Sequence, residues 1–306
     1  IGQGVADFGP NHAAVGTAPD YAQTFYVASY TSATGEALWV AQASHDDSSA
    51  HSAGHGIAID RAGNVYVAGH FSRQTEFGPN LVLDSAQQGT ENIDAFLAKY
   101  DSSGQVLWVR QTTQAALELD GTELYQAIAV DTRANIYVAG HIQSPVHIGE
   151  VYLSPAPGTN MVLAKYDSAG HVQWAHSMPS ARPYALALSS QNGLLVAGCF
   201  AGYSHLPAWD DPIEFSQPGE HVFAARLNPA TGFGEWGLMT AGDTSVFPYE
   251  DCAQSIAASP KGDAVYVSGY FHKTAVFGGP QSLLIAKDAD HTTADLFLAK
   301  IAEPAP

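Results

Sequence analysis

The chain has 306 residues, is rich in glycine (29), tyrosine (14) and phenylalanine (13), and has only 14 % charged residues. Its 12 Lys and Arg against 30 Asp and Glu give a formal net charge of -18. This balance argues against nucleic acid and anionic membranes as partners, because both are bound through Lys and Arg. No stretch approaches the roughly 18 apolar residues that span a bilayer. Many short strands joined by turns are favoured over helices.

The chain begins with Ile1, and no charged segment followed by an apolar run comes after it. We therefore expect a processed form or a fragment of a longer protein.

Two sequence modules alternate along the chain, and each predicts a β-hairpin, because two short apolar runs flank a turn. The inner module ends in a valine- and glycine-rich strand, as in G-I-A-I-D-R-A-G-N-V-Y-V-A-G, and it occupies residues 56–69, 127–140, 185–198 and 255–269. The outer module ends in tryptophan, as in F-L-A-K-Y-D-S-S-G-Q-V-L-W, and it occupies residues 26–39, 96–108, 162–174 and 223–236, with a truncated copy at 297–301.

Tryptophan follows glycine by four residues in each complete outer module. The pairs are Gly35/Trp39, Gly104/Trp108, Gly170/Trp174 and Gly232/Trp236. Four of the five tryptophans are therefore expected to be structural and to pack between neighbouring repeats.

Two hairpins per repeat make a four-stranded antiparallel unit of about 60 to 70 residues, which is the design of a propeller blade. The sequence thus predicts an all-β fold, a single β-propeller domain over residues 1–306 with five blades. The repeat units are approximately 1–42, 53–111, 124–176, 182–238 and 252–301. The spacing from Gly69 to Gly78, applied to Gly9, reaches back to just before Ile1. The first blade is therefore expected to lack strands 1 and 2, and the last to lack strand 4.

These paired modules resemble the bacterial SBBP β-propeller repeat family, and the likeness covers nearly the whole chain. The resemblance implies a propeller fold and an exported or cell-surface protein. It implies no general enzymatic activity.

Long connections between strands 2 and 3, and between strands 4 and 1, should emerge on one face of the propeller. Long loops on a rigid scaffold commonly carry binding residues, and here they are acidic. The candidate ligand-binding residues are Glu118, Asp120, Glu123, Asp210, Asp211, Asp243, Glu250 and Asp251. A protein or carbohydrate partner is expected on this face.

A histidine- and aspartate-rich loop on the same face could hold Ca²⁺ or another divalent metal, because imidazoles and carboxylates are metal ligands. Its candidate ligands are His45, Asp46, Asp47, His51 and His55. The spacing fits no established metal motif, so polar loop residues in solvent are the alternative. No cofactor is firmly indicated. His70 and His141 share one repeat position with Cys199 and Tyr270, which suggests a packing site.

The two cysteines, Cys199 and Cys252, follow strand 2 of one blade and precede strand 1 of the next. We expect a disulfide between them, favoured by an oxidising compartment.

The leading functional hypothesis is a secreted or cell-surface, non-catalytic binding or scaffold module. One alternative is a structural subunit that associates with itself through its incomplete end blades. Another is an enzyme, either carbohydrate-active through loop carboxylates or similar to quinoprotein propellers through its Gly-Trp motifs. The sequence contains no nucleophile elbow, zinc-protease motif or phosphate loop that would support an enzyme.

Overall fold

The computed structural model describes residues 5–8, 13–15, 23–45, 49–85, 92–115, 121–208, 211–241, 251–277, 283–285 and 294–302. These residues form twenty-six strands and no helix. All strand ladders between them are antiparallel, as hairpin modules require.

Three repeats contain an inner and an outer hairpin joined side by side. Their strands are β6 (Ser52–Ile59), β7 (Val65–Ser72), β10 (Ile93–Tyr100) and β11 (Val106–Gln114) in repeat 2; β12 (Leu124–Val130), β13 (Ile136–Ile142), β16 (Asn160–Tyr166) and β17 (Val172–Met178) in repeat 3; and β18 (Ala181–Leu188), β19 (Leu194–Leu206), β20 (Ile213–Leu227) and β21 (Gly234–Ala241) in repeat 4. Within each repeat the strands are neighbours in chain order.

The end repeats contain fewer strands. Repeat 1 contributes the outer hairpin of β3 (Tyr26–Tyr30) and β4 (Ala37–Gln42). Repeat 5 contributes β22 (Cys252–Ala258), β23 (Ala264–Phe271) and β26 (Asp295–Ala302), which pair in that order.

Small hairpins stand where the sequence suggests long loops between strands 2 and 3. They are β8 (Gln74–Gly78) with β9 (Leu81–Asp84), β14 (Val146–Ile148) with β15 (Val151–Leu153), and β24 (Thr274–Phe277) with β25 (Leu283–Ile285); β1 (Val5–Asp7) pairs with β2 (Ala13–Val15). Each of β8, β14 and β24 also pairs with the chain of the preceding repeat, namely β5 (Ser44–His45), β11 and β21. The inserted hairpins therefore join neighbouring repeats.

Side chains of each outer strand alternate between two cores, because successive residues of a strand point to opposite faces. In β10, Phe96 packs with Phe25 and Val67 in the core toward repeat 1. Its neighbour Leu97 packs in the core toward repeat 3. Apolar residues thus fill every interface between consecutive repeats.

Tryptophans link one repeat to the next at the outer rim. Trp39 Nε1 donates a hydrogen bond to the carbonyl of Ser102 at 3.0 Å, in the outer turn of repeat 2. Gly104 in this turn has φ +84, and a Cβ there would lie 2.6 Å from the Trp39 ring. Glycine is needed both for the left-handed conformation and for the close approach.

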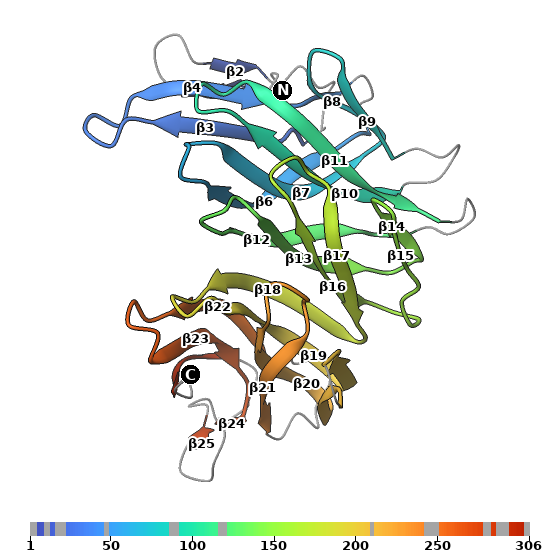
Figure 1. The fold of residues 1–306 in the computed structure, drawn as a ribbon, viewed down its shortest axis with the longest axis vertical. Helices are drawn as coiled ribbons and strands as arrows, with labels where there is room; N and C mark the ends of the chain where they lie inside the picture. The colour runs from blue at the N-terminus through green and yellow to red at the C-terminus, as the bar shows by residue number, and fades with distance from the viewer. Residues whose placement is uncertain are drawn as a thin grey trace.

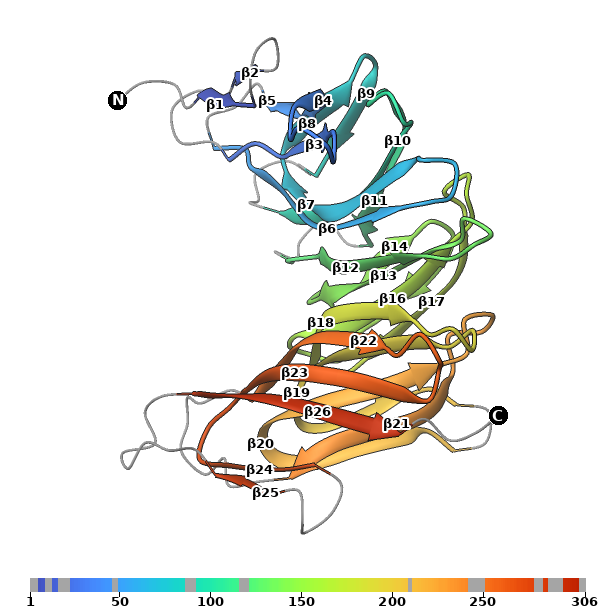
Figure 2. The ribbon, with the colours of Figure 1, turned by 90° about the vertical axis from the view of Figure 1, so that its left-hand side faces the viewer.

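The repeats form an open, curled stack, with repeat 1 at one end and repeat 5 at the other (Figure 1). Strands β6, β12, β18 and β22 lie side by side along the stack (Figure 2). A propeller ring is expected from the sequence, whereas the described strands curl without joining β3 to β26.

Candidate functional site

Three histidines gather at the ends of β6 and β7. His55 and His70 share a hydrogen bond of 2.8 Å between Nε2 and Nδ1, and their rings stack. The ring of His51 meets that of His70 edge-on, while its Nδ1 lies 2.9 Å from Ser72 Oγ. The sequence names His51 and His55 as metal ligands, and the structure brings them together around His70.

His45 lies apart from these three rings and is buried. Its Nε2 is 3.1 Å from Ser52 Oγ, and its Nδ1 is 3.1 Å from Thr75 Oγ1. Both ring nitrogens are engaged in fastening the start of β6 to β8, so His45 holds the fold at this point. Asp46 and Asp47 fall outside the described residues.

Desolvation lowers the pKa of two half-buried histidines, His70 and His141. It lowers the pKa of His70 to about 4, with His55, His51 and His141 adding repulsion. It also lowers the pKa of His141 to about 4, where Arg182 adds to the effect. Both imidazoles are therefore neutral near pH 7.

Acid should unfold the protein partly through these two rings. A base whose pKa is lowered in the folded state contributes stability above its unfolded pKa of about 6.5, and this is lost as the pH falls toward 4. We expect a double variant, His70→Gln with His141→Gln, to lose less stability between these pH values than the wild type. Urea denaturation across this range measures it. Replacing the exposed His147 by Gln is the control and should leave the slope unchanged; equal slopes for all three proteins would contradict the assignment.

The acidic candidates have different surroundings. Glu118, Asp120, Asp210, Asp243 and Glu250 lie outside the described residues, and Asp211 is exposed. Glu123 and Asp251 are buried between repeats and do not present an acidic loop surface to solvent. The reason is local: each lies directly before a first strand, where the chain passes between two repeats.

Asp251 is held in place by His272. The backbone N–H of His272 donates to Asp251 Oδ1 at 2.7 Å, and His272 Nδ1 lies 3.4 Å from the same oxygen. Burial raises the pKa of Asp251, while His272 and the buried His221 oppose this rise. Imidazoles thus offset the buried carboxylate at this junction.

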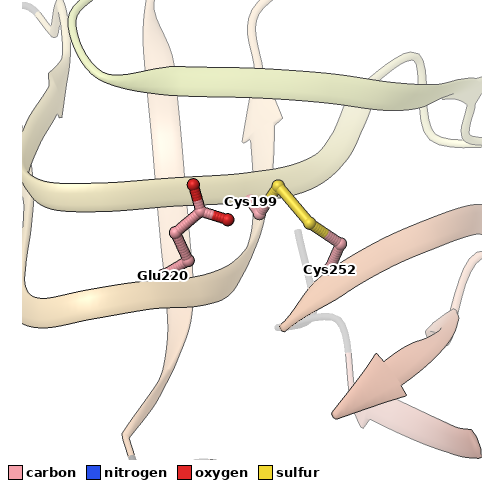
Figure 3. A group of neighbouring side chains, drawn as sticks. All are labelled: Cys199, Glu220 and Cys252. Atoms are coloured by element: carbon pink, nitrogen blue, oxygen red, sulfur yellow. A yellow bond between two sulfur atoms is a disulfide. The ribbon is translucent and has the colours of Figure 1, made fainter. Parts of the chain in front are cut away.

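Cys199 in β19 and Cys252 in β22 are joined by a disulfide with a Cα–Cα distance of 4.7 Å (Figure 3). The Glu220 carboxylate reaches toward it from β20 (Figure 3) and forms an ion pair with Arg182. Among the described residues, this trio is the one group of three His, Cys, Asp or Glu side chains whose ligand atoms all lie within 4.8 Å. The sulfur atoms are bonded to each other, so in this state the trio is a crosslink rather than a thiolate metal site.

Alternating inner and outer hairpins, stacked repeat upon repeat, define this chain as an all-β repeat protein. Residues 38–70 match the family model described as SBBP, a β-propeller repeat. The chain thus contains an SBBP β-propeller repeat, which is the resemblance that its modules indicate. The described residues include no helix able to cross a membrane.

The chain is also 25 % identical, over 296 residues, to a protein of Acanthamoeba polyphaga mimivirus described as an uncharacterised WD repeat-containing protein. The match covers 80 % of this chain and 21 % of that protein. The chain therefore spans about a fifth of the length of this relative.

Proposed function

We propose that this protein is a non-catalytic scaffold that binds other protein chains through a stack of five propeller blades over residues 1–306. Repeats 2, 3 and 4 each supply four consecutive strands, while repeats 1 and 5 supply two and three. WD-type repeats in the relative agree with a binding module, because repeat arrays present extended surfaces to partners.

The proposal rests on the exposure of apolar side chains at the two ends of the stack. In β26, Leu298 stands at the repeat position of Leu97, yet it is 74 % exposed whereas Leu97 is fully buried. In β3, Tyr26 stands at the position of Phe96, and it is 54 % exposed whereas Phe96 is fully buried. At the two ends, Leu298 and Tyr26 face no further repeat, and Tyr26 packs only partly, against the ring of Phe8.

Strand edges show the same pattern. Among the described strands, β3 pairs with β4 alone and β26 pairs with β23 alone, so each has an open edge. A hollow of about 530 Å³ lies beside β3, and residues from β3, β6 and β7 line it. It occupies the place where strand 2 of repeat 1 would stand. Open apolar edges favour association with another strand.

The occupant that we assign to each end is the opposite end of a second copy. Inside the stack, the Leu97 face of one repeat is covered by the strands of the next repeat, and the Phe96 face by those of the previous one. A head-to-tail contact would reproduce this interface between copies, because Leu298 presents the first surface and Tyr26 the second. Such heterologous contacts build rings or filaments.

Association through the ends should therefore be measurable. We expect the wild type to form dimers or larger species at micromolar concentrations in light scattering coupled to gel filtration. Burying one leucine contributes about 1.5 to 3 kcal/mol, so Leu298→Glu should weaken association by roughly 10- to 100-fold.

The matched control is Leu107→Glu, which changes an exposed leucine of β11 away from both ends. It should associate as the wild type does. A wild type that stays monomeric at all concentrations, or equal weakening by both variants, would remove the end-to-end proposal.

A finer proposal concerns location and the loop face. We infer that the protein is exported and works outside the cell or on its surface, and that acidic loops bind a protein or carbohydrate partner. The formal net charge of -18 and the exposed Asp211 support this. The disulfide also suits an oxidising compartment.

A further inference from the structure

Two carboxylates meet inside the junction between repeats 2 and 3. Asp94 is the second residue of β10, and Glu123 directly precedes β12. The backbone brings them together, because Glu123 N–H donates to the carbonyl of Ile93 at 2.8 Å and a parallel bridge joins Ile93 to Thr122.

Both side chains are removed from solvent without full hydrogen bonding. Asp94 is 4 % exposed and Glu123 is fully buried. Ser144 Oγ donates to Glu123 Oε1 at 2.7 Å, but Asp94 Oδ1 and Glu123 Oε2 have no hydrogen-bond partner among the described residues. Buried acceptors without a hydrogen-bond partner destabilise the folded state, and more so when they are charged.

Asn92 adds a third oxygen of the same kind. It is buried, and its Oδ1 also has no hydrogen-bond partner in the described part of the chain. Asn92 directly precedes β10 and lies two residues before Asp94, and the burial of both, with the less buried Ile93 between them, indicates that they face the same side. The Gln114 amide also lies beside Glu123.

The charged groups around Asp94 add negative charge and do not offset it. The charged groups that act on Asp94 are Glu123 and Asp84, both acidic. Burial first, and then Glu123, raises the pKa of Asp94 to about 8. Burial raises the pKa of Glu123 as well.

Equivalent junctions in the same chain are built differently. The strand registers place His221 and Asp251 at this position between repeats 4 and 5, so an imidazole faces the carboxylate there. Asn160 and Ala181, which are uncharged, stand at the position between repeats 3 and 4. The junction of repeats 2 and 3 alone among these three combines two acids.

We propose that Asp94 and Glu123 bind a divalent cation of the Ca²⁺ type between repeats 2 and 3, with the Asn92 amide oxygen as a further ligand. An all-oxygen donor set selects Ca²⁺ or Mg²⁺ over zinc. Ca²⁺ accepts six to eight oxygens in flexible geometry, including backbone carbonyls and water. The ion would fix two repeats together, a role separate from end-to-end association.

Calorimetric melting of the whole chain tests this. Ca²⁺ at about 100 times its Kd should raise Tm by roughly 4 °C relative to chelator, because binding stabilises the folded state. Asp94→Asn and Glu123→Gln should lose this rise. In the metal-free state of Asp94→Asn, the introduced amide can donate a hydrogen bond to Glu123, so this variant is expected to fold. The control is Asp211→Asn at an exposed acid, which should keep the full rise.

A titration of the wild type alone gives a second readout that needs no variant to fold. Isothermal titration calorimetry with Ca²⁺ should show a saturable site of about one ion per chain, and Asp211→Asn should keep it. Identical melting with Ca²⁺ and chelator, a rise that persists in Asp94→Asn, or a titration without such a site would each overturn the proposal.

Discussion

Replacing Gly140 by alanine is expected to destabilise the protein by more than about 4 kcal/mol, or to prevent folding, which places it among the most damaging single substitutions. Gly140 lies near the end of β13, and a Cβ there would lie 1.8 Å from the carbonyl oxygen of Leu124. The facing strand has an irregular register between Tyr125 and Ala127, so its backbone crosses close to the glycine. Backbone atoms cannot turn away as a flexible side chain can.

Gly35→Ala is the matched control for this substitution. Gly35 has φ +71, but a Cβ there would meet nothing within 4 Å. Its replacement should cost only the left-handed strain of about 1 to 2 kcal/mol. Urea denaturation of both variants separates close approach from strain. Similar losses for the two would show that the β13 contact relaxes and that the argument is wrong.

This glycine also shows why much of the fold could be predicted. Gly69, Gly140, Gly198 and Gly269 stand at one position in the second strand of four repeats, and each faces a backbone carbonyl at about 2 Å from its missing Cβ. The close approach of a backbone carbonyl requires glycine in each of the four repeats, so glycine recurs in the sequence at the spacing of the repeats. The turns of the inner hairpins also follow one rule. Asp60 Oδ1 accepts hydrogen bonds from the backbone of Ala62 and Asn64 at 2.9 Å, and Asp131 Oδ1 does the same with Arg133 and Asn135. Local rules of this kind are visible in a sequence.

The inserted hairpins were harder to predict. Their strands of three to five residues are too short to show a period, and β14 is ordered by pairing with β11 of the preceding repeat. The spacing from Gly69 to Gly78 was a usable signal, although it indicated only the residue at which β8 ends. These hairpins form through contacts with segments that are distant in the sequence, so the local sequence does not reveal them.

The candidate site was predicted only in part for the same reason. The sequence groups His45 with His51 and His55 because they are close in the chain. Strand pairing instead brings His55 to His70 and His45 to Thr75. Glu123 looks like a loop acid until its strand is placed against β10. Asp94 is invisible in the sequence, since it stands in an ordinary strand position.

Loss of the disulfide is expected to remove about 4 kcal/mol of stability. The bond between Cys199 and Cys252 closes a loop with a sequence separation of 53 residues. Closing a loop of this length restricts the unfolded chain, and the chain-entropy relation gives about 4 kcal/mol at 25 °C. The variant Cys199→Ala with Cys252→Ala should therefore unfold at lower urea, because β19 and β22 are then held by packing alone.

Reductant provides the control for this pair. It should lower the stability of the wild type to nearly that of the double variant, and it should leave the variant itself unchanged. A remaining difference in stability between the reduced wild type and the double variant measures the packing of the buried sulfur atoms, since an alanine leaves a small cavity. If the oxidised wild type and the variant unfold at the same urea concentration, the crosslink does not stabilise the junction of repeats 4 and 5. Apolar packing between these repeats, around Leu195 and Val267, would then account for it by itself.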